Sequence, residues 1–386
     1  MKTVITARRL ITPTELIESP VVVIENGRID VLLSRELKET PAGARQLDFP
    51  GLTLAPGFID VHVHGGAGHD VMENDPSSLQ AIQHHMARHG VTGYLPTTVT
   101  APQDNILRAL EHLGKAVAGG DDAKNGARPL GIHLEGPFIS HAKRGVHSPE
   151  NLVEPSPQLL DRFWQASAGT LRMITIAPEL TGALETIRHA NTLGIHCSLG
   201  HSDATLDQAR AAIDAGAGHA THTFNAMRRL DHRDPGIAAA VLTADKVSAD
   251  IIADGVHVDP SMVRLFLRAK GRDRAVLITD AISAAGMPEG RYRLGPLDVE
   301  VRGNRCEYQG RLAGSVLTLD QAVRNVVSFA GWTLEDAIRL ATSNPAHLLG
   351  ETARGAIAPG RAADMVALAD DGTVRQTLVA GELVQP

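Results

Sequence analysis

Short apolar segments alternate with longer amphipathic segments over most of the chain. From about residue 51 to about residue 350, runs rich in β-branched residues are typical of buried strands, and the segments between them repeat apolar residues at helical spacing. The expected strands cover residues 58–63, 93–98, 131–134, 171–176, 195–199, 219–224, 247–252 and 275–279. The expected helices cover residues 76–89, 102–118, 180–193, 206–215, 260–269, 319–329 and 334–341. This order predicts an α/β fold, a (β/α)8 TIM-like barrel. A doubly wound open sheet is the alternative, but no glycine-rich phosphate loop follows an early strand.

Both ends of the chain have strand patterns without intervening helices. Residues 3–10, 21–25 and 29–33 are rich in β-branched residues, and Asn26-Gly27 is a hairpin-turn signal between the last two. Two further strand-like segments, 364–368 and 377–380, lie near the C-terminus. We therefore expect a small β-sandwich domain formed by the N- and C-terminal segments. The predicted division is 1–54 for the first part of this domain, 55–350 for the barrel and 351–386 for the second part.

Composition narrows the choice of partners and compartment. Of the 386 residues, 43% are hydrophobic and 21% are charged, and the formal net charge of -7 argues against nucleic acid as a partner. No apolar run reaches the roughly 18 residues of a membrane span, and the first residues lack the apolar core of a signal peptide. We therefore expect a cytoplasmic protein with no membrane partner. Cys197 and Cys306 are far apart in sequence and are expected to be buried thiols, not a disulfide or a zinc site.

Histidines and a glutamate stand where two of the expected strands end. His62 and His64 lie two residues apart, so both face the same side of their strand, and the glycines behind them leave room for an ion. Glu135 ends another apolar strand, where an unpaired carboxylate is costly to bury. A salt bridge in a loop is the alternative explanation for Glu135. His133 shares its strand face, but we favour a structural role for His133.

Other strand ends leave alternatives open. His201 follows one expected strand, and it is either a ligand or a hydrogen-bonded core residue. His219 and His222 both lie in the next expected strand, and spacing does not choose between them. Asp280 follows the last one and is either a site residue or the N-cap of a following turn.

Taken together, these strand ends point to one site. In a parallel barrel they all converge on the C-terminal mouth, where active sites form. Neutral imidazoles with carboxylates are ligands that zinc or iron prefers, and the set contains no sulfur ligand. The pattern therefore predicts a metal centre at this mouth.

Several short motifs follow one another along the chain. They are Pro56-Gly57-Phe58-Ile59-Asp60, His133-Leu134-Glu135-Gly136-Pro137-Phe138, Gly200-His201-Ser202, His222-Thr223-Phe224-Asn225-Ala226-Met227, Asp254-Gly255-Val256-His257, Thr279-Asp280-Ala281 and Leu312-Ala313-Gly314-Ser315. The first resembles the opening barrel strand of the amidohydrolase superfamily. The others, in this order, resemble the N-acetylglucosamine-6-phosphate deacetylases of that superfamily, and the resemblance runs along nearly the whole chain. The Glu-Gly-Pro-Phe and Phe-Asn-Ala-Met motifs are its most selective parts.

The resemblance implies a two-metal site. The residues implied as ligands of the principal metal are Glu135, His201 and His222. His62 and His64 would hold a second ion, with Glu135 bridging the two. Two divalent ions per chain are therefore expected, zinc first, with iron, manganese or cobalt as alternatives.

The resemblance also implies the catalytic and substrate contacts. Asp280 would be the general acid/base, and His147 would donate a hydrogen bond to the scissile carbonyl. The residues implied around a phosphorylated amino sugar are Val146, His147, Asn225, Ala226, Arg233, His257, Leu312, Ala313 and Gly314. In the family the phosphate contacts involve a neighbouring subunit, so a homodimer with shared sites is expected. The alternative for Arg233 is a surface ion pair with Asp231 or Asp234.

The implied reaction is hydrolysis of the N-acetyl amide of N-acetylglucosamine 6-phosphate to glucosamine 6-phosphate and acetate. One alternative is an amidohydrolase for N-acyl amino acids or cyclic amides, which would need an arginine or a basic pair for a carboxylate. The other is a non-catalytic barrel scaffold, in which the ligands should have been lost. No serine or cysteine nucleophile with a histidine partner is evident, so a covalent route is disfavoured.

Overall fold

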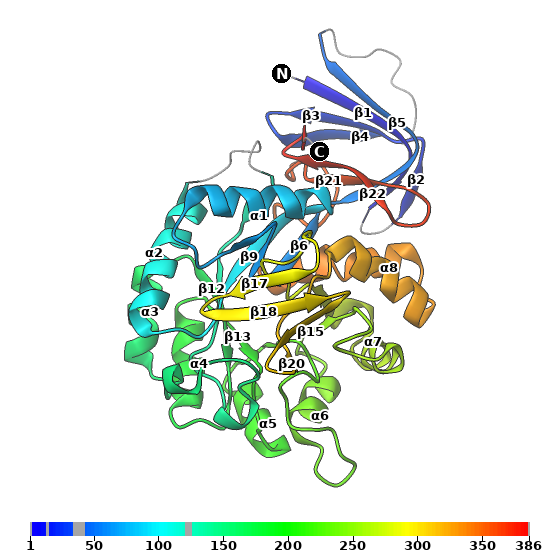
Figure 1. Cartoon of the computed structure of the whole chain (residues 1–386). Coiled ribbons are helices and arrows are strands. Elements are labelled where there is room, and N and C mark those ends of the chain that lie inside the picture. The colour runs from blue at the N-terminus through cyan, green and yellow to red at the C-terminus, as the bar shows by residue number, and fades with distance from the viewer. Residues whose placement is uncertain (1, 13–14, 34–42, 120–125, 385–386) are drawn as a thin grey trace.

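A curled parallel sheet covered by helices forms the larger part of the molecule (Figure 1). The computed structural model describes residues 2–12, 15–33, 43–119 and 126–384. Within them, the parallel strands are β6 (Phe58–Val63), β9 (Val91–Thr98), β11 (Ile132–Glu135), β12 (Leu171–Ile176), β13 (His196–Leu199), β14 (His219–Ala220), β15 (Ala249–Ile252) and β16 (Ala275–Ile278). Strands β6, β9, β11, β12, β13 and β14 pair in this order, with β10 (Arg128–Pro129) beside β9, and β15 pairs with β16. The fold is therefore mixed α/β, as predicted.

Single backbone hydrogen bonds continue this order beyond the paired strands. The N–H of Thr223, which lies three residues past β14, donates to the carbonyl oxygen of Asp250 in β15 over 2.9 Å. The Asp280 N–H donates to His62 O, also over 2.9 Å, which joins the end of β16 to β6. The C-terminal ends of β6 and β16, the first and last of these parallel strands, therefore lie side by side.

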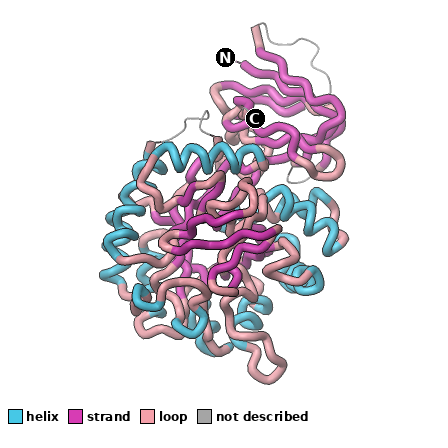
Figure 2. Tube along the Cα trace, viewed as in Figure 1, coloured by secondary structure: helices cyan, strands magenta, loops and turns pink. Residues whose placement is uncertain are grey.

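Helices follow the strands along the chain and lie on the outer face of the sheet (Figure 2). They are α1 (Pro76–Arg88), α2 (Gln103–Ala118), α3 (Pro157–Ala166), α4 (Ala183–Thr192), α5 (Leu206–Asp214), α6 (Gly236–Thr243), α7 (Pro260–Arg274), α8 (Leu319–Ala330), α9 (Leu334–Arg339) and α10 (Ser343–Leu348). Their starts follow capping rules: the Asp75 side chain accepts the Ser77 N–H before α1, and Thr205 and Gln208 form a capping box at α5. Two short 3-10 turns, His141–Lys143 and Pro149–Asn151, lie between β11 and α3.

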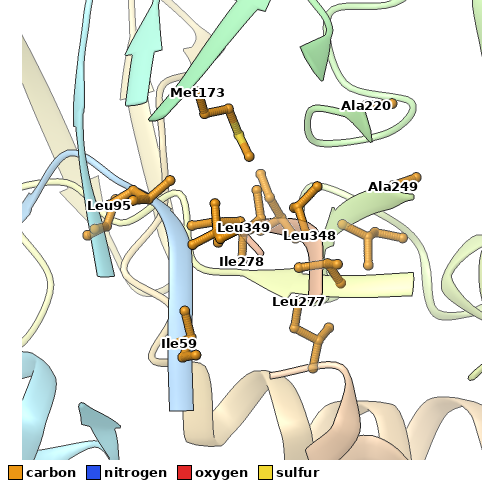
Figure 3. Close-up of a cluster of buried hydrophobic side chains, with 14 of the residues drawn as sticks. Ile59, Leu95, Met173, Ala220, Ala249, Leu277, Ile278, Leu348 and Leu349 are labelled. Atoms are coloured by element: carbon orange, nitrogen blue, oxygen red, sulfur yellow. The ribbon is translucent and has the colours of Figure 1, made fainter. Parts of the chain in front are cut away.

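Apolar side chains fill the interior of the curled sheet (Figure 3). Ile59, Leu95 and Leu277 from three strands belong to the same buried cluster as Leu348 and Leu349 from the end of α10. Such side chains form the close-packed apolar part of the body that supports the strand ends.

A separate sheet joins the two terminal segments of the chain, blue and red in Figure 1. Its strands are β1 (Lys2–Ile11), β2 (Leu16–Glu18), β3 (Val21–Glu25), β4 (Arg28–Leu33), β5 (Arg45–Pro56), β21 (Met365–Leu368), β22 (Val374–Val379) and β23 (Glu382–Leu383). The order is β23-β22-β21-β5-β1-β3-β4, with β2 beside β1. Ile5, Leu54 and Met365 belong to its own apolar cluster. Strand β5 reaches Pro56, so it leads directly into β6.

An antiparallel sheet inserted between β16 and α8 was not expected from the sequence. It consists of β17 (Gly290–Leu294), β18 (Leu297–Arg302), β19 (Arg305–Tyr308) and β20 (Arg311–Leu312), and in Figure 1 it crosses the front of the α/β body in yellow. In β18 the side chains alternate between buried and exposed, which is the two-residue period of a half-buried strand. A two-stranded hairpin, β7 (Gly65–Gly66) and β8 (His69–Asp70), follows β6.

The expected strand at 219–224 is shorter than predicted. β14 ends at Ala220 because the backbone at His222, Phe224 and Ala226 has positive φ (31°, 80° and 48°), which is incompatible with a strand. None of the helices in the described ranges is both long and apolar enough to cross a membrane.

Candidate active site

Six polar side chains from five strand ends meet in one place. His62 lies in β6 and His64 directly after it, Glu135 is the last residue of β11, and Asp280 lies two residues past β16. His201 and His222 follow β13 and β14 in the same way. All six are buried, although each is of a type that prefers water.

Glu135 lies at the centre of this cluster. Its Oε1 atom is 3.0 Å from His222 Nε2 and 3.2 Å from His201 Nε2, and these two nitrogens are 3.1 Å apart. Its Oε2 atom is 3.3 Å from His64 Nε2. Glu135 therefore stands between one histidine pair from β13 and β14 and another from β6.

The second histidine pair faces Asp280. His62 Nε2 and His64 Nε2 are 3.1 Å apart, and Asp280 Oδ1 lies 3.6 Å and 3.2 Å from them. Within the described residues the contacts of the Asp280 carboxylate are these two imidazoles and no backbone N–H of the following turn, so the N-cap alternative for this aspartate does not hold. Its carboxylate instead points into the cluster.

Hydrogen bonds set the tautomer of two of these histidines. His64 Nδ1 is 2.9 Å from Thr97 O, and His201 Nδ1 is 2.9 Å from Lys143 O. Because a carbonyl oxygen only accepts, both Nδ1 atoms carry a proton, so the neutral form of each ring has its lone pair on Nε2, the atom that faces the cluster. A carbonyl on the far nitrogen is the usual support for a metal-ligating histidine.

The spacing and charge of the cluster also suit divalent cations. Two nitrogens bound to one tetrahedral zinc would be roughly 3.3 Å apart, close to the 3.1 Å of each histidine pair. Burial lowers the pKa of His222, but Glu135 raises it more, to about 9. The pKa of His64 is likewise raised by Asp280 and Glu135 against the effect of burial. The buried carboxylates of Glu135 and Asp280 are thus stabilised by positive charge beside them, which a divalent ion would supply.

His147 has the opposite tautomer from His64 and His201. The Thr100 N–H donates to His147 Nδ1 over 3.3 Å, and the Thr100 hydroxyl lies 2.8 Å from the same atom. Since Nδ1 accepts, Nε2 carries the proton, and it lies 3.5 Å from Glu135 Oε2. Ligand atoms of Glu135, His147 and His201 lie within 4.8 Å of one another, as do those of His62, His64 and Asp280. With its proton on Nε2, His147 would act as a hydrogen-bond donor toward the site, which is the role expected for it from the sequence.

The choice between His219 and His222 depends on Asp250. His219 Nε2 bonds Asp250 Oδ2 over 2.9 Å, whereas Asp250 Oδ1 accepts the backbone N–H of His222. His219 is therefore turned away from the cluster, and His222 is turned into it. His133 is satisfied by Val61 O at 3.0 Å and the Thr175 hydroxyl at 2.8 Å, which fits the structural role expected for it.

Asp60 is a buried supporting residue that the sequence analysis did not single out. Its carboxylate accepts the His62 N–H at 3.2 Å and the Thr279 hydroxyl at 2.6 Å. Asp60 therefore joins the backbone of His62 to Thr279, the residue that precedes Asp280. Burial raises the pKa of Asp60 to about 6, against the effect of these hydrogen bonds. The only sign of this role in the sequence is the position of the aspartate, two residues before the histidine pair.

Three of the six clustered residues have a strained backbone. His201, His222 and Asp280 have φ of 46°, 31° and 50°. Such left-handed conformations cost on the order of 1–3 kcal/mol each for residues other than glycine. They turn each side chain inward at the point where its strand ends.

A cavity of about 230 Å³ opens beside the cluster. Most of the predicted substrate-binding residues line it, namely Val146, His147, Asn225, Ala226, His257, Leu312, Ala313 and Gly314. Asn225 Nδ2 is buried without a partner in the described residues, so it is a free donor. His257 Nδ1 bonds Asp254 Oδ2 over 2.7 Å, which leaves its Nε2 atom for a ligand. Val99 and Leu294 also line the cavity and were not predicted.

Arg233 does not line this cavity. It is exposed in the segment between β14 and α6, and only its backbone N–H bonds Asp231, at 2.9 Å. Asp234 pairs instead with Arg228, and within the described ranges the Arg233 side chain has no ion pair with either aspartate. No lysine or arginine of the described chain lines the cavity.

Comparison with known proteins agrees with this geometry. The amidohydrolase family model matches residues 53–384, which is most of the chain. The chain belongs to the amidohydrolase family, whose members are hydrolases that typically bind divalent metal.

Its relatives within the family are amino-sugar phosphate deacetylases. Over 385 residues, 99% of each chain, it is 40% identical to the N-acetylgalactosamine-6-phosphate deacetylase of Escherichia coli O157:H7. It is 39% identical to the N-acetylglucosamine-6-phosphate deacetylase of Vibrio furnissii, over 95% of this chain and 91% of that one. The solved structure of a variant N-acetyl-D-glucosamine-6-phosphate deacetylase from Mycobacterium smegmatis, in complex with N-acetyl-D-glucosamine-6-phosphate, matches all of both chains with a TM-score of 0.91 and 38% identity.

Proposed function

We propose that this enzyme hydrolyses the N-acetyl amide of N-acetylglucosamine 6-phosphate, releasing glucosamine 6-phosphate and acetate. The observation that carries the proposal is the meeting of four imidazoles and two carboxylates at the strand ends, beside a cavity with free polar groups. The full-length similarity to deacetylases of phosphorylated amino sugars selects the substrate class. Zinc is the metal that the donor set suits first, with iron, manganese or cobalt as alternatives.

Two ions per chain fit the arrangement. Glu135, His201 and His222 would hold one ion, and His62 and His64 a second, with Glu135 between them. When bound, such ions lower the pKa of water and polarise an amide carbonyl.

The chain's own groups would then move the protons. The Nε2–H of His147, oriented by Thr100, donates to the carbonyl oxygen of the amide. Asp280 accepts a proton from the attacking water and returns it to the glucosamine nitrogen as the C–N bond breaks. Burial raises the pKa of Asp280, but His64 and His62 lower it to about 2, so the carboxylate is ionised at neutral pH.

The sugar phosphate would occupy the rest of the cavity. Asn225 and His257 have atoms free for it, and Leu312 to Gly314 supply a surface for the sugar ring. The cavity of one chain has no lysine or arginine among its described lining residues, although a phosphate favours paired arginine donors. We therefore infer a homodimer in which Arg233 of one subunit reaches the phosphate bound in the other.

N-acetylgalactosamine 6-phosphate is the second candidate substrate. The observation that favours it is the 40% identity with an N-acetylgalactosamine-6-phosphate deacetylase over the full length. The two sugars differ only in the orientation of one hydroxyl, so they would use the same metal and proton-transfer groups.

The proposal includes a finer view of the fold. We infer that the parallel strands close into a (β/α)8 barrel, supported by the hydrogen bonds from Thr223 to Asp250 and from Asp280 to His62. The sheet of terminal strands would form the small sandwich domain from 1–54 and 351–386, around its own apolar cluster.

Acetate release tests the proposed function. Enzyme stripped with a chelator and reloaded with a defined metal should release acetate from N-acetylglucosamine 6-phosphate much faster than from N-acetylglucosamine. N-acetylgalactosamine 6-phosphate in the same assay ranks the second candidate. No release from either phosphorylated sugar with any of zinc, iron, manganese and cobalt would contradict the assignment.

A further inference from the structure

Two buried apolar side chains line the cavity without a part in metal binding, proton transfer or phosphate recognition. Val99 follows β9, and Leu294 ends β17 in the inserted sheet. Their exposed fractions are 2% and 3%, and Val146 lines the cavity with them. They are thus an apolar wall in a cavity whose other side chains are mostly polar.

This wall stands beside His147. Val146 precedes His147 in the chain, and Val99 precedes Thr100, whose N–H fixes the His147 ring. Leu294 and Val146 pack in one apolar cluster, and Gly295, the residue after Leu294, lies against Val99: an added Cβ there would be only 2.3 Å from Val99 Cγ1. The apolar wall therefore lies beside His147 in the same cavity, and His147 is the residue that donates to the carbonyl oxygen in the proposed function.

The geometry of the amide indicates which part of the substrate contacts this wall. The carbonyl carbon carries an oxygen, a nitrogen and the acyl chain. The oxygen goes to His147, and the nitrogen leads to the sugar and so toward Asn225 and His257 at the polar part of the cavity. The acyl chain has no polar atom, so apolar contact is the environment that stabilises it.

Neighbouring contacts hold the wall in place. The Val99 N–H bonds Met72 Sδ over 3.3 Å, and the Gly295 N–H bonds Asp70 Oδ2 over 2.6 Å. Leu294 packs in the apolar cluster of the inserted sheet together with Leu297. A close-packed wall of this kind cannot retreat to admit a longer chain without strain.

We propose that Val99 and Leu294, together with Val146, bind the acyl group and limit the substrate to short N-acyl chains. This inference rests on the proposed deacetylase function and adds the acyl specificity of the same site. It assigns the inserted sheet a role in substrate selection, because Leu294 is its contribution to the cavity.

The test compares N-formyl, N-acetyl, N-propionyl and N-butyryl glucosamine 6-phosphate. One methylene in an apolar pocket is worth roughly 10- to 200-fold in discrimination. Wild-type kcat/KM should therefore fall at least about 10-fold from acetyl to propionyl. Leu294→Ala should raise the propionyl-to-acetyl ratio of kcat/KM by about 10-fold or more, because it removes the wall from the path of the longer chain.

Three further variants make the test specific. Leu297→Ala is the matched control: it lies in the same apolar cluster but does not line the cavity, so it should leave the ratio unchanged even where it lowers stability. Val99→Ala opens the wall from the other side and serves where Leu294→Ala folds poorly. Val99→Leu should shift preference from acetyl toward formyl.

The outcomes separate the two levels of the proposal. Unchanged acyl ratios in folded Leu294→Ala and Val99→Ala, with acetyl hydrolysis retained, overturn the acyl wall. A change in ratio as large in Leu297→Ala overturns it as well. Failure of the wild-type enzyme to release any acyl group contradicts the proposed function instead.

Discussion

At the level of single residues, Asp280 is the group whose role is most sharply testable. Asp280→Asn preserves the shape of the side chain but removes its capacity to accept a proton. Because general acid–base groups contribute on the order of 10²- to 10⁴-fold, we expect kcat to fall by that factor. Metal content, measured by elemental analysis, should stay the same. Retention of more than about a third of the rate would assign proton transfer to another group.

The histidine pair of β6 gives a second test at this scale. Replacing both His62 and His64 by Ala removes two imidazoles from one side of Glu135 and leaves His201 and His222 on the other. We expect the bound metal to fall from about two ions per chain to about one, measured after dialysis against zinc. Replacing the structural His133 by Asn is the control and should leave the metal content unchanged. One ion per chain in both the wild type and the double variant would rule out the second site.

Part of this site was accessible from sequence, and part was not. The spacing of His62 and His64 on a strand places both side chains on one face, so the structure brings them together as expected. The choice between His219 and His222 depends on a positive φ at His222 and on Asp250, which belongs to the next strand. Neither the backbone conformation at His222 nor its contact with Asp250 can be read from the local sequence pattern. Leu294 was not predicted to line the site, because its strand belongs to an inserted antiparallel sheet that lies outside the alternation of strands and helices.

At the level of elements, apolar periodicity located the strands that bear the site. The predicted ranges 58–63 and 171–176 agree with β6 and β12, because both are short β-branched runs between polar turns. The inserted strands β17 to β20 were missed, because their charged residues obscured the alternation now seen in β18. α6 was not predicted either, because Gly236–Thr243 is apolar almost throughout and has no polar face. α3 was also not predicted, although its buried residues Leu160 and Phe163 lie at helical spacing.

The contact between α1 and α8 yields a prediction about stability. Asp320, near the start of α8, lies 3.2 Å from His89 Nδ1 at the end of α1 and 2.8 Å from Arg324 Nη1. Burial raises the pKa of Asp320, but the neighbouring His89, Thr318 and Arg324 side chains lower it by more, to about 2. A carboxylate whose pKa falls on folding stabilises the protein above its unfolded pKa of about 4, and this contribution is lost as the pH falls toward 2.

Asp320→Asn should therefore lower the free energy of unfolding by roughly 2 kcal/mol at pH 7. The difference from wild type should hold down to about pH 4 and shrink below it. Unfolding midpoints measured between pH 3 and pH 7 check this. Asp298→Asn breaks an exposed pair with Arg293 and should change stability by less than about 1 kcal/mol. A gap for Asp320→Asn that is constant down to pH 3 contradicts the assignment.

At the level of the whole molecule, the position of Arg233 makes the oligomeric state a functional question. Its side chain is exposed and lies outside the cavity of its own chain. If a neighbouring subunit uses it, Arg233→Ala should raise KM for N-acetylglucosamine 6-phosphate by about 10-fold or more. Unphosphorylated N-acetylglucosamine should be affected far less. Equal losses for both sugars would remove the phosphate role.

Mixing the two impaired variants, and assaying at a substrate concentration well below the KM of Arg233→Ala, tests whether the sites are shared. Asp280→Asn chains supply Arg233, and Arg233→Ala chains supply Asp280, so a mixed dimer would contain one site with both groups. We expect activity to return after the two proteins are mixed, unfolded and refolded together. Refolding each variant alone is the control. No gain in the mixture would show that each chain binds the phosphate by itself.

The sheet that joins the two terminal segments has a consequence for biosynthesis. One edge of β5 pairs with β1, but the partner of its other edge, β21, lies about 300 residues further on. At roughly 5–20 residues per second, a ribosome needs on the order of 15–60 s to reach β21. During that time the nascent chain presents an open strand edge, which is a template for pairing with other chains. Chaperone demand during synthesis should therefore centre on this small sheet, although the chemistry resides elsewhere.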